Sequence, residues 1–215
     1  MDPSPLRPAI EPVKPRGGRR AGAGRPSKPG SVSHRRRPGF RPHSPVHVTL
    51  RVERHVWNLR AQRCLRPIDA ALRALRSREE RFRVTHFSVQ GSHLHFVVEA
   101  RDRHELASAF QSFGIRVARA LHRVMGRKGR VFAARYHARA LRTPTEVVNV
   151  VRYVLANHAR HVPGAAIADR FSSAAVFTAW EALELPSARV TYALPGLDPP
   201  VVPARGHLLR SGLAR

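Results

Sequence analysis

The segment RVTHFSVQGSHLHFVVE, residues 83–99, has the sequence pattern that most clearly predicts the fold of this chain. Polar and apolar residues alternate on both sides of Gly91-Ser92, and a two-residue connection with glycine first is typical of a type II′ turn. The segment therefore predicts a β-hairpin with a defined register. The predicted cross-strand pairs are Gln90 with His93, Ser88 with His95, and His86 with Val97.

This register gives the hairpin one polar and one apolar face. The polar face collects His86, Ser88, Gln90, His93 and His95, and the apolar face collects Phe87, Val89, Leu94, Phe96 and Val98. The apolar face predicts a core, and the polar face is either a functional surface or simply a solvated one. Because His93 and His95 stand at i and i+2, their imidazoles are close enough to share a metal ion.

A second group of polar residues lies on a predicted helix that begins near Thr143-Pro144-Thr145-Glu146, a pattern with an N-cap threonine and proline at the first helical position. Asn149, Tyr153 and Asn157 follow at intervals of four residues, so we expect them to share one face of this helix. Asn157 is either a third metal ligand or a cap at the end of the helix. Two histidines and an asparagine leave positions open on a hard divalent cation for water or a phosphate oxygen.

Periodicity elsewhere predicts the remaining elements of an α+β fold. Residues 46–52 alternate as a strand, Ile68, Leu72 and Leu75 recur at helical spacing before Glu79-Glu80, and a long helix runs from Asp102 to Gly126. Residues 130–141 are expected to be extended. The predicted order is that of a ferredoxin-like split βαβ sheet with an added C-terminal helix that carries Tyr153.

The composition divides the chain into three parts. Residues 1–43 are rich in proline, glycine and arginine and are expected to form a disordered basic tail. Residues 44–185 are expected to form the folded domain, and residues 186–215 a second disordered tail that is rich in proline and basic. The single cysteine, Cys64, excludes an internal disulfide.

The net charge predicts a polyanionic partner. The 215 residues include 39 Lys+Arg and 14 Asp+Glu, which gives a formal charge of +25, and most of the basic residues are arginine. Nucleic acid is the expected partner, since the basic N-terminal segment lacks the apolar face of a membrane-binding helix. No run approaches the roughly 18 apolar residues of a spanning helix, and no signal peptide is evident. We therefore expect a cytoplasmic protein with no membrane partner.

Three segments of the chain resemble a known family. Residues 85–99 are similar to the HUH motif (His, hydrophobic, His) of single-tyrosine transposases related to the insertion-sequence-200 type. Residues 129–139, followed by 151–157, resemble the branch associated with repetitive extragenic palindromes, in which an Arg-Tyr strand precedes a helix of pattern Tyr-x-x-x-Asn. The resemblance extends from about Pro45 to Trp180. One departure is His158, which stands where that branch often has proline.

The resemblance implies a function and a site. The implied reaction is cleavage and rejoining of single-stranded or hairpin DNA through a 5′-phosphotyrosine and a free 3′-hydroxyl. The implied nucleophile is Tyr153, and the implied ligands of Mg²⁺ or Mn²⁺ are His93, His95 and Asn157. Arg135, Arg139 and Arg152 are expected to contact phosphate near the site. Some members of the family are dimers, so a homodimer is a further possibility.

Three other classes remain open. An inactive or domesticated DNA-binding protein would keep the fold and the basic surface. A replication or mobilisation nuclease would use the same chemistry, although such chains usually carry further modules. An RNA-binding module would present aromatic side chains on the exposed strands, whereas the polar face predicted here carries histidine, serine and glutamine.

Overall fold

The computed structural model describes residues 39–214, so most of the predicted N-terminal tail lies outside the described residues. The last residues of that predicted tail are held by the fold. Phe40 packs against the core, and the His43 N–H donates to the Ala100 carbonyl at 2.9 Å. Within the described part, no helix is long and apolar enough to cross a membrane.

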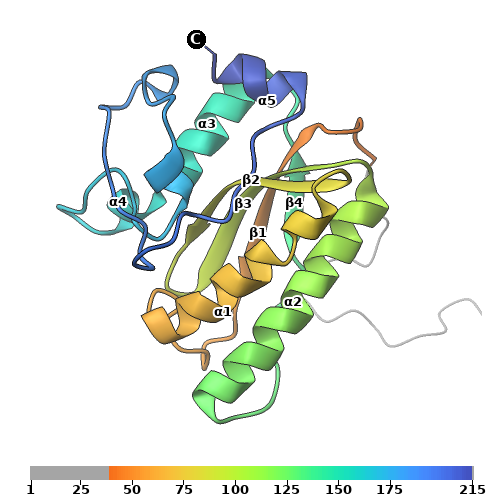
Figure 1. The fold of residues 1–215 in the computed structure, drawn as a ribbon, viewed down its shortest axis with the longest axis vertical. Coiled ribbons are helices and arrows are strands. Elements are labelled where there is room, and N and C mark those ends of the chain that lie inside the picture. Colours follow the sequence, from red (N-terminus) through yellow and green to blue (C-terminus); the bar gives the residue numbers. More distant parts are fainter. Residues whose placement is uncertain (1–38, 215) are drawn as a thin grey trace, which may run out of the picture. The chain divides into compact units, whose positions relative to one another are not determined.

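Four strands form one antiparallel sheet in the order β2-β3-β1-β4 (Figure 1). The strands are β1 Pro45–Arg51, β2 Phe82–Val89, β3 His93–Ala100 and β4 His137–Ala140. Helix α1, Gln62–Arg73, connects β1 to β2, and helix α2, Arg103–Met125, connects β3 to β4. Each of these crossovers passes over one intervening strand, as in split βαβ units. The structure confirms an α+β fold on a four-stranded antiparallel sheet.

The predicted register of the β2–β3 hairpin is confirmed. Ser88 pairs with His95 and His86 with Val97, and the Gln90 N–H donates to the His93 carbonyl at 2.9 Å. The structure adds a bulge at Thr85, whose hydroxyl donates to the Val97 carbonyl at 2.9 Å. The extra residue lets Val84 face the core while His86 faces the opposite side, which a strictly alternating strand could not do.

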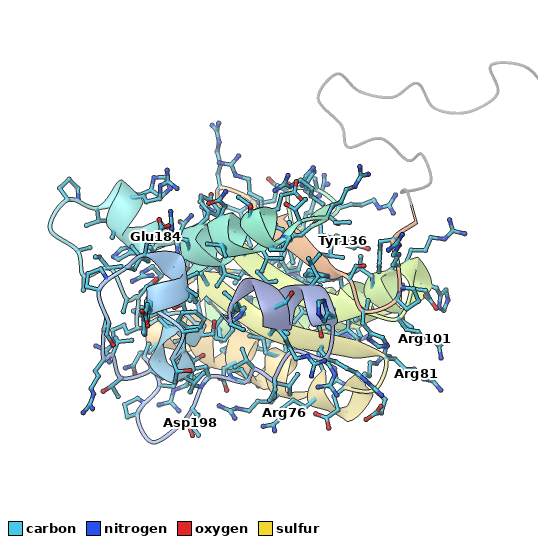
Figure 2. All side chains as sticks on the ribbon, turned by 90° about the horizontal axis from the view of Figure 1, so that it is seen from above. Arg76, Arg81, Arg101, Tyr136, Glu184 and Asp198 are labelled. Carbon is cyan, nitrogen blue, oxygen red and sulfur yellow. The ribbon has the colours of Figure 1, made fainter. Side chains whose placement is uncertain are left out.

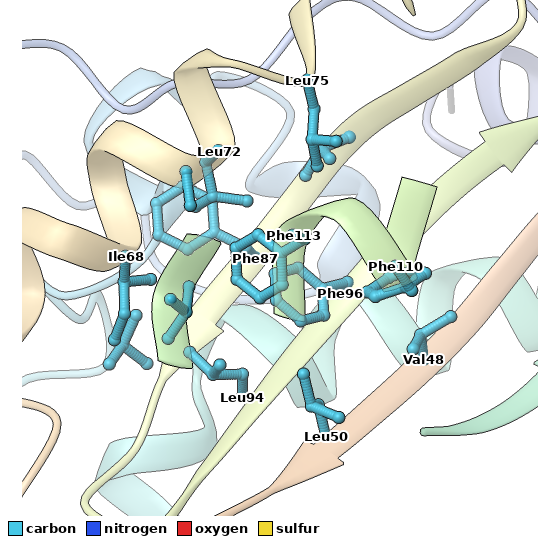
Figure 3. Packing of buried hydrophobic residues seen from close by; sticks show 14 of the residues in the cluster. Val48, Leu50, Ile68, Leu72, Leu75, Phe87, Leu94, Phe96, Phe110 and Phe113 are labelled. Carbon is cyan, nitrogen blue, oxygen red and sulfur yellow. The ribbon is translucent and has the colours of Figure 1, made fainter. Parts of the chain in front are cut away.

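The apolar face of the sheet packs against α1 and α2. Phe87 and Phe96 from the hairpin meet Phe110 and Phe113 from α2 in a cluster of buried rings (Figure 3). Rings of this size dominate core energetics, and their edge-to-face contacts add about 0.5–1.5 kcal/mol per pair beyond the area they bury. This cluster fixes the sheet face that is turned away from His93 and His95.

The opposite face is covered by α3, Pro144–Leu155, so the sheet lies between α3 and the pair α1 and α2 (Figure 2). This helix contains many valines, which are poor helix formers, so local signals and packing must hold it. The Thr143 hydroxyl accepts from the Glu146 N–H at 3.2 Å, which confirms the predicted N-cap. The inward side chains of α3 then form the second core. They are Val147, Val150, Val151, Val154 and Leu155.

Three short 3₁₀ helices and two short α-helices complete the described elements. The 3₁₀ helices are Arg76–Arg78, Ser173–Val176 and Glu181–Leu183, and the α-helices are α4 Asn157–His161 and α5 His207–Gly212. The first helix was predicted to extend to Glu79-Glu80, but α1 already ends at Arg73 and a 3₁₀ helix follows it. Helix α2 agrees with its prediction, with an Asp102 carboxylate that accepts from the His104 and Glu105 N–H groups and a left-handed Gly126.

The prediction of a disordered C-terminal tail was wrong. Residues 186–214, dark blue in Figure 1, pack on the fold and end in α5. Tyr192 is buried in the main core and donates to Asp69 at 3.1 Å. The carboxylate of Glu99, itself fully buried, accepts from the Arg205 and Gly206 N–H groups at 2.7 and 2.9 Å. Prolines limit regular structure here, but spaced apolar residues and these hydrogen bonds still anchor an irregular backbone.

Candidate functional site

Strand β3 places His93 and His95 together on the sheet face below α3, as predicted. Their ring centroids are 4.8 Å apart, in an edge-to-face arrangement. His95 is 4% exposed, while His93 is partly exposed at the end of the strand beside the Ser92 turn. The pair therefore lies at the boundary between the buried interface with α3 and solvent.

Strand β1 contributes two residues that the sequence interpretation missed. Thr49 lies directly opposite His95 in the β1–β3 register, and His47 lies opposite Val97. The Thr49 hydroxyl is 3.2 Å from His95 Nδ1, and His47 Nε2 is 3.3 Å from the same atom. The alternating His47-x-Thr49 pattern was visible in the sequence, but only the pairing of β1 with β3 assigns these residues to the site.

Helix α3 brings Tyr153 to the same place. Its hydroxyl lies 3.4 Å from His95 Nε2, and the two rings meet edge to face at 5.0 Å. Because Val150, Val151 and Val154 are buried against the fold, rotation of the helix is restricted and the phenol stays over the histidines. The guanidinium of Arg160, on α4, lies 5.7 Å from the centre of the tyrosine ring. His93, His95 and Tyr153 are thus brought together by two elements far apart in sequence.

The imidazoles of this group are neutral near pH 7. Burial lowers the pKa of His95 from 6.5 to about 3, and repulsion from His93, His47 and His161 acts in the same direction. Burial also lowers the pKa of His47 to about 4, assisted by the charge of Arg139. The pKa of His93 is lowered by burial and by Arg51. A neutral imidazole has the free lone pair that binds a metal ion or accepts a proton.

Asn157 does not continue the helical stripe of Tyr153, which corrects the sequence interpretation. Helix α3 ends at Leu155, Ala156 leaves the helical conformation with φ −101° and ψ 11°, and Asn157 begins α4. Its side chain is fully buried, and neither Oδ1 nor Nδ2 has a hydrogen-bond partner among the described residues. The same two atoms therefore do not cap the end of α3 either, where the C-cap residue is Ala156, whose N–H donates to the Arg152 carbonyl.

The side chains present fit a divalent cation. Within residues 39–214, no group of three or more His, Cys, Asp or Glu side chains is placed to hold a metal ion, but the predicted set differs because it includes an amide. His93 and His95 are adjacent and neutral, and Asn157 has a buried oxygen that no residue of the described part of the chain contacts through a hydrogen bond. An unsatisfied buried polar atom costs about 1–3 kcal/mol, which coordination of the oxygen would offset. The assignment of His93, His95 and Asn157 as ligands stays a prediction.

The three predicted phosphate-contacting arginines lie in different surroundings. Arg139, on β4, is opposite His47 in the sheet and forms an ion pair with Glu146 at 3.2 Å. Arg135 is exposed just before β4. Arg152 donates from Nε to the Leu183 carbonyl at 2.7 Å and from Nη2 to Glu184 at 2.9 Å, so two of its three nitrogens are already engaged. Contact with phosphate stays a prediction for all three residues.

Comparison with known proteins gives distant structural matches. No protein-family model matches the chain. No curated protein matches it either. The structure of a REP-associated tyrosine transposase bound to a REP hairpin is similar, with a TM-score of 0.47 and 15% identity, over 60% of this chain and 74% of that chain.

A second similar structure is that of a candidate transposase from Deinococcus radiodurans, with a TM-score of 0.38 and 12% identity, over 51% of this chain and 87% of that chain. At these values the likenesses carry no argument about chemistry, which must come from the site itself. The chain thus has structural matches to a REP-associated tyrosine transposase and to a second transposase-like protein, both at low sequence identity.

Proposed function

We propose that this protein is a metal-dependent DNA transesterase, a transposase of the HUH single-tyrosine type, which cleaves and rejoins single-stranded DNA through a 5′-phosphotyrosine. The observation that supports this most directly is the 3.4 Å approach of the Tyr153 hydroxyl to His95 Nε2, next to His93. A phenol beside neutral imidazoles combines a nucleophile with groups able to bind a cation or take up a proton. The charge of +25 is suited to a nucleic-acid substrate.

In the proposed reaction, the Tyr153 oxygen attacks a DNA phosphorus and the bond from phosphorus to the 3′ oxygen breaks. The phenolic proton is transferred by way of the site to the departing 3′ oxygen, so the products are a phosphotyrosine and a 3′-hydroxyl. Rejoining reverses these steps, and the ester link conserves the bond energy. Mg²⁺ or Mn²⁺ held by His93, His95 and Asn157 would polarise the scissile phosphate. The buried valines of α3 keep the phenol in place during both steps.

The polarity of the covalent link tests this proposal. Single-stranded hairpins with randomised flanks, labelled at either end, are incubated with the protein and Mn²⁺ and resolved on a denaturing gel. We expect the 3′ label to move with the protein and the 5′ label to appear in a shorter free strand. A protein-linked 5′ label would contradict the proposed polarity. Binding without any adduct would instead favour a domesticated or inactive DNA-binding protein on the same fold.

Thr49 provides a prediction about the metal site. Its hydroxyl and His47 occupy the Nδ1 side of His95, which leaves Nε2, the nitrogen that faces Tyr153, for a metal ion. Residues that orient a metal-binding histidine typically change metal affinity by about 10–100-fold. We expect Thr49→Val to weaken Mn²⁺ binding by about tenfold, the lower end of that range because His47 remains.

The measurement is titration of Mn²⁺ followed by electron paramagnetic resonance, without DNA. Thr49→Ser keeps the hydroxyl and is the matched control, with an affinity expected near that of the wild type. If the valine and serine variants bind Mn²⁺ equally well, Thr49 does not orient His95.

A further inference from the structure

A basic groove lies at the β4 edge of the sheet, and its lining does not include Tyr153, His93 or His95. Its volume is about 1400 Å³. Its walls come from the segment 39–44, the start of α2, the residues from 135 to 142 and the start of α5. This volume exceeds the ~300–1,000 Å³ of pockets that hold one small molecule, so the groove suits an extended chain.

The groove carries an excess of positive charge. Five arginines line it, namely Arg41, Arg103, Arg135, Arg139 and Arg142, and its carboxylate is Glu146. That carboxylate is already engaged, since it accepts from the Arg142 N–H at 2.6 Å and pairs with Arg139 at 3.2 Å. Arg41, Arg103 and Arg135 form no ion pair with any residue between 39 and 214. Guanidinium groups without a carboxylate partner are suited to phosphate.

The floor of the groove is apolar. Phe40, Leu106 and Ala138 are among its lining residues, and all three belong to the core or pack against it. Arginines around an apolar floor suit a strand that turns its phosphates to the guanidinium groups and its bases to the floor. A double helix presents phosphates on its outside and keeps its bases stacked inside, so it would leave this floor unused.

One residue of the groove pairs with a residue of the candidate site across two neighbouring β-strands. Arg139, one of its lining residues, lies opposite His47, and its charge contributes to the field at that histidine. A DNA strand whose reacting phosphate is at Tyr153 would therefore enter the groove at Arg139, which lies on the β-strand next to that of His47. Arg152 is not part of the groove lining, which agrees with its contacts to Leu183 and Glu184.

The geometry points to this groove as the binding path for the single-stranded DNA that flanks the reacting phosphate. The inference deepens the proposed function and relies on it for the nature of the strand. Five arginines supplied by three separate segments would contact phosphates without reading bases, so the groove adds affinity and direction, and sequence preference must come from elsewhere.

The test compares two triple variants with the same loss of charge. The groove variant is Arg41→Gln/Arg103→Gln/Arg142→Gln, and the control is Arg66→Gln/Arg76→Gln/Arg123→Gln, three exposed arginines that are not among the groove residues. Binding to oligo(dT) is measured by fluorescence anisotropy with chelator present, over a range of salt concentrations. Each lost single-strand phosphate contact changes the slope of log K against log[salt] by about 0.7, so the groove variant should lose about 2 units of slope and the control almost none.

Two results would contradict the proposal that this groove binds single-stranded DNA. The first is an equal salt-dependence slope for the two triple variants, and the second is a groove variant that binds duplex DNA weakly while its oligo(dT) binding is unchanged. Equal melting temperatures establish that both variants are folded. The adduct assay separates this inference from the proposed function. If the wild type forms the adduct and the slopes are equal, only the groove is wrong. If the slopes differ and no adduct forms, the groove does bind single-stranded DNA and the transesterase proposal is wrong.

Discussion

Replacing Tyr153 by phenylalanine is expected to abolish the covalent protein–DNA adduct completely. The variant removes the one oxygen that lies 3.4 Å from His95 Nε2 and keeps the ring that packs against His95 and His47. The lost contact is long, so the free energy of unfolding should change by about 1 kcal/mol or less. Affinity for hairpin DNA should also be nearly unchanged. The assay is the denaturing gel with labelled hairpin DNA and Mn²⁺, together with anisotropy for binding.

The other two tyrosines are controls. Tyr136 packs on Phe110 in the main core, and Tyr192 donates to Asp69 beneath the C-terminal segment. Tyr136→Phe and Tyr192→Phe should therefore retain the adduct. Tyr192→Phe is expected to lose about 1–3 kcal/mol of stability, because a buried carboxylate loses a donor, so the assay is run well below its melting temperature. An adduct that persists in Tyr153→Phe and is lost in Tyr136→Phe would show that Tyr153 is not the nucleophile.

The hairpin could be predicted because the residues that determine its register are close together in the sequence. A two-residue turn at Gly91-Ser92 fixes the register, and the period of two then assigns every later side chain to a face. The structure confirms this for Ser88 and His95, seven residues apart in sequence. The caps at Asp102 and Thr143 were predictable for the same reason, since each depends on residues within one turn of its helix.

The missed parts of the site depend on contacts distant in sequence. Thr49 and His95 are 46 positions apart in the sequence. The alternating pattern of β1 predicts a strand, but it does not indicate which other strand pairs with β1 or in which register. The packing of residues 186–214 also depends on distant partners, chiefly Asp69 and Glu99. The break at Ala156 has no glycine or proline to signal it, so the end of α3 at Leu155 could not be predicted from the sequence.

Acidification is expected to destabilise the protein through the same imidazoles that form the site. His95 has a pKa of about 3 in the folded protein and 6.5 when unfolded, so the unfolded state binds a proton first. Its contribution to stability is fully present above pH 6.5 and is lost as the pH falls toward 3. At pH 5 the loss from His95 alone is on the order of 2 kcal/mol. His47 and His86, whose pKa values are both lowered to about 4, act in the same direction.

Urea denaturation at pH 7.5 and pH 5, in buffer with chelator, measures this loss. His95→Gln removes the titrating group, so the difference in stability between the two pH values should shrink by about 2 kcal/mol, whatever the variant costs at pH 7.5. His55→Gln, at an exposed position, is the matched control and should keep the wild-type difference. If His95→Gln also keeps that difference, His95 is not held neutral by the fold. Its nitrogens would then carry protons in mildly acidic solution, and the site would be less suited to bind a cation than its geometry suggests.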